Sequence, residues 1–216
     1  MSQTSIEWTD YTLNPGIYGC SRVSPGCTHC YAGRMAARLV AMGEYPASAV
    51  RDGDWSGQGT VDYDRIGPAF ATLPKHKPAR VFVTSMADLF HAEVPDEFIR
   101  QTFAEMSARP HRTFQVLTKR IERVLPWYRA AGPGYRWPPN VWIGTTIEDQ
   151  KRADELLPVL VRLRMAPVRF VSAEPLLGPV EMSIFLYTGF EPNNPRRGSD
   201  AVNWLISGGE SGPGAR

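Results

Sequence analysis

The sequence predicts an α/β fold in which a parallel sheet with outer helices forms a partial (β/α)6 barrel, built as one domain over residues 1–216. Three observations carry this prediction. Short, almost continuously apolar segments alternate with segments of helical period after residue 79, a further strand pattern lies near the N-terminus, and three cysteines follow that first strand in one loop. Strands of this apolar character that alternate with helices are typical of parallel βαβ units.

The first 79 residues contain the least regular elements. We expect a first strand near residues 12–18 and a helix over residues 31–42, because apolar side chains recur there at helical spacing until Gly43 ends the pattern. Residues 44–79 are rich in glycine, proline and aspartate, which predicts a long connection or insertion. Within it we expect a short strand over residues 60–66 and a helical turn over residues 68–73.

The rest of the chain predicts a regular alternation of strands and helices. The expected strands cover residues 80–85, 113–118, 140–146, 168–172 and 202–207. The expected helices cover residues 95–108, 121–131 and 149–163, each with apolar side chains on one face. Together with the first strand, this pattern gives the six strands of a partial barrel.

Composition and charge leave the partner of the protein open. The chain has 216 residues, with 24 Lys and Arg against 22 Asp and Glu, and a formal net charge of +2. Proteins that bind nucleic acids or membrane surfaces usually carry a larger basic excess. The chain lacks a run of about 18 apolar residues, and its start lacks the basic and apolar regions of a secretory signal. We therefore expect a cytoplasmic protein without a membrane partner.

The three cysteines are the most informative residues of the chain. Cys20, Cys27 and Cys30 are spaced C-x6-C-x2-C, and a Pro-Gly pair, which favours a tight turn, precedes Cys27. An odd number of cysteines in one short loop argues against a disulfide framework. Three interpretations remain: a four-iron, four-sulfur cluster with one iron that lacks a protein ligand, a zinc site completed by a distant histidine, or small buried thiols.

Polar side chains follow several of the expected strands. They gather where the carboxyl ends of the strands meet, which is the edge at which (β/α) barrels carry their chemistry. Any one of them is explained by a turn or a helix end, but together they predict a ligand site at this edge. These residues are Ser85, Asp88, Lys119, Arg120, Thr145, Thr146, Glu148, Glu174 and residues 208–211.

A three-cysteine loop after the first strand of a partial barrel resembles the radical S-adenosylmethionine (radical SAM) superfamily. More closely, several segments resemble a phage-associated three-Cys-motif family that lacks an assigned activity. These segments are residues 6–10, 14–15, 20–31, 85–91, 114–120, 174–178 and 208–212. The sequence differs from the usual superfamily motif, C-x3-C-x2-C with an aromatic residue before the last cysteine, because its first spacer is longer and His29 stands before Cys30. Ser85 and Asp88 stand where that superfamily has a glycine-rich motif.

The resemblance implies a radical enzyme with two cofactors, a [4Fe-4S] cluster and S-adenosylmethionine (SAM). It implies that an electron donor reduces the cluster and that SAM is cleaved to methionine and a 5′-deoxyadenosyl radical, which takes hydrogen from the substrate. It assigns the cluster to Cys20, Cys27 and Cys30, and the methionine amino group to Ser85 and Asp88. It leaves Thr118, Lys119, Thr145 and Glu148 for the carboxylate and ribose of SAM, and Glu174 for adenine or substrate.

The substrate is not defined by the sequence. A phage-associated setting suits a nucleotide or a nucleic-acid base, and Lys119 and Arg120 at the expected active edge suit phosphate groups. The alternative is a non-catalytic, zinc-stabilised module that binds nucleic acid, and a third reading is a barrel enzyme that uses its cysteines as thiols. The chain ends directly after the sixth strand, so we also expect that a C-terminal segment which covers the site is absent.

Overall fold

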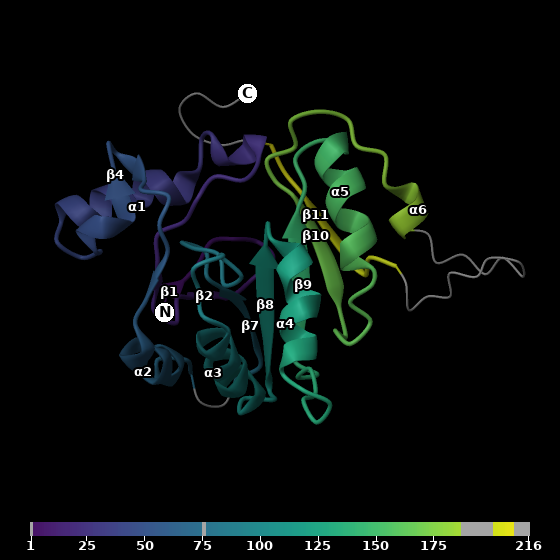
Figure 1. The fold of residues 1–216 in the computed structure, drawn as a ribbon, viewed down its shortest axis with the longest axis horizontal. Coiled ribbons are helices and arrows are strands. Elements are labelled where there is room, and N and C mark those ends of the chain that lie inside the picture. The colour runs from purple at the N-terminus through teal and green to yellow at the C-terminus, as the bar shows by residue number, and fades with distance from the viewer. Residues whose placement is uncertain (1, 75–76, 187–200, 210–216) are drawn as a thin grey trace, which may run out of the picture.

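The computed structural model describes residues 2–74, 77–186 and 201–209, and it has a mixed α/β architecture (Figure 1). Its main sheet has seven strands in the order β1-β2-β7-β8-β9-β10-β11. The first pair is antiparallel, and the six strands from β2 to β11 are parallel. The strands are β1 (Ser2–Gln3), β2 (Tyr11–Leu13), β7 (Ala79–Val83), β8 (Arg112–Thr118), β9 (Val141–Thr146), β10 (Arg169–Ala173) and β11 (Trp204–Ser207).

Each parallel strand lies next to the strand that follows it in the main sheet. This single winding is the one found in (β/α) barrels, whereas a doubly wound sheet reverses its strand order. Within the described residues the sheet stays open, with β1 at one edge and β11 at the other. The prediction of a six-stranded parallel sheet with surrounding helices is therefore confirmed, while closure into a barrel is not seen.

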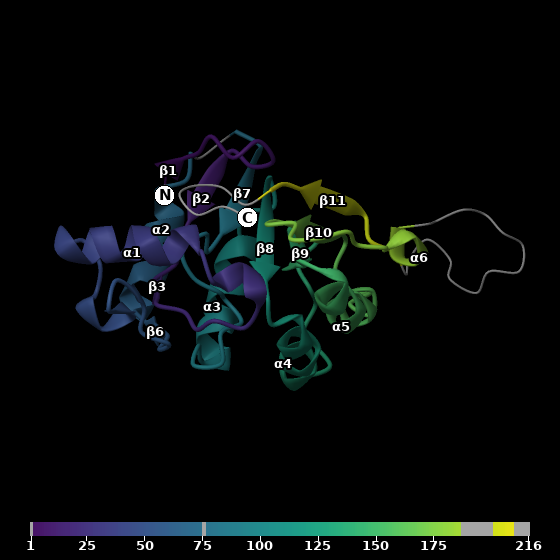
Figure 2. The same ribbon diagram turned by 90° about the horizontal axis from the view of Figure 1, so that it is seen from above.

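Helices pack on one face of this sheet. Figure 2 shows α3, α4 and α5 side by side on that face, whereas α1 lies beyond the sheet near β2. The core between these layers is built from side chains such as Phe98, Phe103 and Trp127, which are fully buried. The helices are α1 (Tyr31–Ala41), α2 (Ile66–Ala71), α3 (Asp96–Ser107), α4 (Val124–Ala130), α5 (Gln150–Leu160) and the short α6 (Ser183–Leu186). Within the described residues, none of them is long and apolar enough to cross a membrane.

The opposite face of the sheet carries a row of aromatic rings. Side chains alternate between the two faces of a strand, so Phe82 points away from the helix-side residues Val81 and Val83. The ring of Phe82 lies 4.8 Å from that of Trp8. The row continues from Trp8 to Phe170, from Phe170 to Trp204 and from Trp204 to Trp142, with ring centroids 6.5, 6.3 and 5.3 Å apart.

The prediction of one strand near residues 12–18 was wrong. The segment forms two strands, β2 in the main sheet and β3 (Ile17–Tyr18), which pairs with β6 (Thr60–Val61) outside it. A turn at Asn14 separates them, because its side chain accepts hydrogen bonds from the backbone N–H groups of Gly16 and Ile17 at 3.0 and 2.8 Å. Gly16 has a φ of 111°, a backbone conformation that glycine adopts without strain.

The long connection contains small elements of its own. Besides β6, it holds β4 (Val50–Arg51) paired with β5 (Asp54–Trp55), and the helical turn expected over residues 68–73 is α2. The strand expected over residues 60–66 is confirmed only for β6, because a 3-10 helix (Tyr63–Arg65) follows it directly. The other expected strands and helices lie within a few residues of their predicted positions.

Candidate functional site

A cavity of about 500 Å³ opens at the carboxyl edge of the parallel strands. Its volume is that of a small-molecule site. Its walls come from the cysteine loop, from the start of α1 and from the segments that follow β7, β8 and β10. The residues singled out from the sequence that line it are Cys20, Cys27, Cys30, Ser85, Asp88, Thr118, Lys119, Arg120, Thr146, Glu174 and Gly209.

Two predicted ligand residues lie outside the walls of this cavity as the described residues form them. Thr145 is fully buried, and its hydroxyl donates to the backbone carbonyl of Thr118 at 2.8 Å. Glu148 is also fully buried and lies against the cysteine loop, where a Cβ atom on Gly26 would approach the Glu148 carboxylate to 2.6 Å. Both side chains are therefore directed at other groups of the protein and not into the cavity.

Apolar walls of the cavity were missed by the sequence analysis. Trp8 and Phe82, which are in ring contact, line it together with Trp55 and Tyr31. The alternation of side chains along β7 was the available signal for Phe82, but no strand pattern identifies Trp8, which lies in the loop before β2. The cavity thus combines an aromatic wall with a polar edge.

The cysteine loop contains one turn of 3-10 helix over Pro25–Cys27, as the Pro-Gly pair suggested. The N–H of Cys27 donates to the carbonyl of Ser24 at 3.0 Å. Cys30 is the residue directly before α1, and the hydroxyl of Tyr31 donates to the backbone carbonyl of Ser85 at 2.7 Å. The loop and the helix that follows it are thereby held at the end of β7.

Asp88 organises the centre of the site. Its Oδ1 accepts hydrogen bonds from the N–H of Phe90 at 2.9 Å and from the hydroxyl of Thr118 at 2.7 Å. Its Oδ2 accepts from the N–H of Lys119 at 3.2 Å and from the guanidinium of Arg120 at 2.8 Å. A carboxylate offers about four lone-pair positions, so these four donors occupy its acceptor capacity. In this structure Asp88 is a structural acceptor and has no position left for a further donor.

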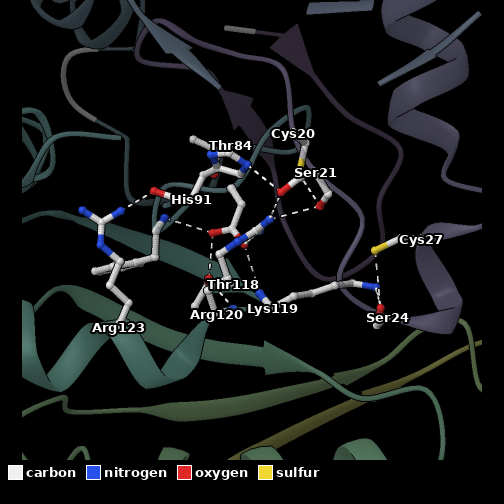
Figure 3. Close-up of polar contacts among 12 residues, drawn as sticks. Cys20, Ser21, Ser24, Cys27, Thr84, His91, Thr118, Lys119, Arg120 and Arg123 are labelled. Atoms are coloured by element: carbon white, nitrogen blue, oxygen red, sulfur yellow. Dashed lines mark hydrogen bonds and ion pairs between the residues drawn. The ribbon is translucent and has the colours of Figure 1, made fainter. Parts of the chain in front are cut away.

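Arg120 connects Asp88 to the cysteine loop. Its Nη2 donates to the carbonyl and the hydroxyl of Ser21 at 3.0 and 2.7 Å, and the Ser21 hydroxyl also contacts Nε2 of His91 at 2.8 Å (Figure 3). Nδ1 of His91 accepts a hydrogen bond from the N–H of Glu93. Burial lowers the pKa of His91, and the nearby Arg120 adds to this effect. His91 is therefore a neutral ring that donates to Ser21 through Nε2.

Lys119 connects the end of β8 to a second point of the loop. Its ammonium group donates to the Ser24 hydroxyl at 3.0 Å and to the carboxylate of Glu148. The Ser24 hydroxyl also donates to Glu148 and lies 3.4 Å from the sulfur of Cys27. Figure 3 shows Lys119 extended toward Ser24 and Cys27, and Arg120 directed toward Ser21.

The surroundings of the thiols differ. Burial and the neighbouring carboxylate of Asp88 raise the pKa of Cys20 to about 12. Burial also acts to raise the pKa of Cys27, but the Lys119 ammonium, together with hydrogen bonds within the cysteine loop, outweighs it, and the pKa of Cys27 is lowered. Cys27 therefore ionises more readily than Cys20.

The three cysteines match an iron-sulfur cluster in donor type. All are free and partly buried, and they line one cavity, so each thiolate could reach a group held there. Within the described residues, however, no three His, Cys, Asp or Glu side chains are close enough together to form a ready metal site. A tetrahedral zinc site needs four donors, and His91 instead contacts Ser21 and Glu93.

Glu174 is the carboxylate of the cavity with the fewest contacts. It follows β10, and one of its oxygens accepts from the hydroxyl of Ser172 at 3.0 Å. Within the described part of the chain this is its only hydrogen bond. Gly208 leaves room for the other oxygen, because a Cβ atom there would lie 2.8 Å from it. Glu174 therefore has acceptor capacity for a ligand. Residues 210–216, which include part of the predicted 208–211 segment and the chain end, lie outside the described residues.

Fold and site define an α/β protein with a ligand-sized cavity, lined by three free cysteines, at the carboxyl edge of a parallel sheet. A family model described as "Protein of unknown function (DUF5131)" matches residues 3–216, and the chain belongs to this family. No curated protein and no solved structure gives a significant match.

Proposed function

We propose that this protein is a radical SAM-like enzyme, in which Cys20, Cys27 and Cys30 hold a [4Fe-4S] cluster and SAM binds beside it. One observation carries the proposal. The three cysteines line the same cavity as the polar residues that follow β7, β8 and β10, so a cluster and a small ligand could occupy it together. The single winding of the sheet also supports a partial barrel of the radical SAM type.

The chain's own residues would bind and orient the ligand. When bound, the cluster would supply the electron that splits SAM, drawn from an external electron donor. Glu174, whose carboxylate retains acceptor capacity, would bind a donor group of SAM such as its amino group, and Ser85 would assist. Asp88, with four donors already bound, would act by holding Thr118 and Arg120 in place.

The aromatic wall favours a substrate with a flat ring, such as a nucleotide or a nucleic-acid base. Trp8 and Phe82 line the cavity, and aromatic rings stack favourably on nucleobases. The same wall would exclude water from a reactive radical. Lys119 and Arg120 are engaged by the cysteine loop in this structure, so they contribute less to the proposal of a phosphate-bearing substrate than the aromatic rings do.

Anaerobic reconstitution with iron and sulfide tests this function. We expect about four irons per chain and an electron paramagnetic resonance signal of the reduced protein that changes when SAM is added. The variant Cys20→Ala, Cys27→Ala, Cys30→Ala should lose both. Stoichiometric zinc without a stable cluster would refute the proposal and favour a zinc-stabilised binding module.

A further inference from the structure

The spacer between Cys20 and Cys27 needs support from outside itself. It comprises six residues, Ser-Arg-Val-Ser-Pro-Gly, and Val23 is 40% exposed, so the spacer buries little apolar surface. Ordering each residue costs about 1–2 kcal/mol of backbone entropy. Besides the contact of Ser21 with His91 and the ion pair of Arg22 with Asp54, contacts that offset this cost come from the end of β8, which lies far away in the sequence.

Arg120 holds the first end of the spacer. Its guanidinium spans two partners, with Nη1 on Asp88 and Nη2 on the carbonyl and hydroxyl of Ser21. Ser21 directly follows Cys20. The Arg120 and Asp88 side chains are only 9% and 8% exposed, so their ion pair is screened little by solvent. The planar fork of the guanidinium allows both contacts at once.

Lys119 holds the second end. Its ammonium group binds the Ser24 hydroxyl and the buried carboxylate of Glu148, and Ser24 lies next to the sulfur of Cys27. Glu148 also packs against Gly26, where a side chain would collide with it. Each of the two adjacent cations is thus balanced by its own carboxylate and touches its own serine.

We infer that Lys119 and Arg120 are positioning residues that hold the two ends of the cysteine spacer and orient Cys20 and Cys27 toward the cavity before any cluster binds. The anchoring of the spacer by Lys119 and Arg120 does not depend on a cofactor. Its consequence for cluster assembly rests on the proposed function. Adjacent residues at a strand end point in different directions, which explains how two neighbours reach two separate points of the spacer (Figure 3).

The spacer provides its own probe, because trypsin can cleave after Arg22, whose side chain is 52% exposed while it pairs with Asp54. The metal-free chain is digested briefly under reducing conditions, and the fragment that ends at Arg22 is quantified by mass spectrometry. We expect Arg120→Met and Lys119→Met to accelerate this cleavage by about tenfold or more, since each loses charge-assisted hydrogen bonds that keep the spacer closed. Unchanged cleavage in both variants would overturn the inference.

Milder variants separate positioning from general loss of stability. Ser24→Ala removes one anchor and leaves all four charged side chains in place, so it should still accelerate cleavage after Arg22. Arg120→Lys keeps the charge beside Asp88 but lacks the fork that reaches Ser21, and we expect it to behave like Arg120→Met. If it behaves like the wild type, Arg120 only balances Asp88 and the inference fails for that residue.

A matched control comes from the next arginine along the chain. Arg123 donates to the backbone carbonyls of His91 and Val94 and to the carboxylate of Asp96, the last two at 2.6 Å, and none of these three residues belongs to the spacer. Arg123→Met should therefore leave cleavage after Arg22 unchanged. Equal acceleration in this control would also overturn the inference.

Iron loading then links positioning to the proposed function. We expect the anchor variants to retain several-fold less iron than the wild type and the control. If the wild type itself takes up no iron while the anchor variants still loosen the spacer, the proposed function fails and the positioning role stands. If iron loads equally in all variants, the positioning role in cluster assembly is refuted.

Discussion

Replacing Asp88 by asparagine, an isosteric change, should strongly destabilise the protein. The amide oxygen of asparagine can still accept from Phe90 and Thr118, but its NH₂ group would face the Lys119 N–H and the Arg120 guanidinium, which are both donors. Arg120 would then be a buried charge without a counter-ion. Breaking one side of such a pair costs about 3–5 kcal/mol. Domains of ordinary stability unfold with about 5–15 kcal/mol, so this is a large fraction of the total.

Urea denaturation of the metal-free protein measures this effect. With typical slopes of about 1–3 kcal/mol per molar urea, the unfolding midpoint should fall by about 1 M or more. The double variant with Arg120→Met tests the cause, because removing both partners leaves no uncompensated charge. The loss in free energy of unfolding in the double variant should therefore be smaller than the sum of the losses in the two single variants, by about 1–3 kcal/mol.

A change of less than about 1 kcal/mol in Asp88→Asn would refute this reasoning, because a loss that small is the size of one neutral hydrogen bond. Strict additivity in the double variant would also contradict it. Either result would mean that solvent reaches the ion pair more freely than the exposed fractions of 9% and 8% indicate.

Three further predictions concern other parts of the molecule. Gly144→Ala should cost about 1–3 kcal/mol in urea denaturation, because the new Cβ would lie 2.7 Å from ring atoms of the buried Phe170; an unchanged midpoint would show that the ring can move. Because the pKa of His91 is lowered in the folded protein, the unfolded chain binds a proton more readily there. The contribution of His91 to the free energy of unfolding should therefore be fully present above pH 6.5 and should decline as the pH falls from 6.5 toward the lower folded pKa. In His91→Gln this decline in stability should be smaller. If the variant and the wild type showed the same dependence of stability on pH, this prediction would be wrong. Glu174→Gln keeps an acceptor for Ser172 but loses the charge, and equilibrium dialysis should show SAM bound about tenfold or more weakly to the reconstituted protein; equal affinity would remove Glu174 from the ligand site.

The regular half of the fold could be predicted because the burial of one face of a helix, or of a whole strand, gives the sequence a recognisable pattern of apolar residues. Strands β8, β9 and β10 are buried along most of their length and appear as short segments rich in apolar, aromatic and β-branched side chains, while α3 and α5 show one apolar face. The segment around Asn14 was misjudged because its neighbours favour strands. A side chain that bonds to the backbone two and three residues ahead overrides that preference.

The location of the site at the carboxyl edge of the sheet could be predicted from the sequence, but the contacts between its side chains could not. Parallel strands bring their carboxyl ends together, so the sequence indicated which polar residues would gather. It did not indicate that Glu148 would bind Lys119 and Ser24, since those residues are 29 and 124 positions away. Nor did it indicate that Asp88 would be saturated by four donors, because hydrogen-bond partners depend on side-chain positions that no sequence period encodes.

The sequence distance between the cysteine spacer and its anchors has a consequence for biosynthesis. Ser24 precedes Lys119 by 95 positions, and Ser21 precedes Arg120 by 99. At a synthesis rate of about 5–20 residues per second, the cysteines leave the ribosome roughly 5–20 s before the residues that hold them. During this interval the three thiols lie in a chain segment that lacks its anchoring contacts, so metal ions and oxidants can reach them. For the proposed cluster, this order favours delivery of iron and sulfide after translation, once β8 has joined the sheet.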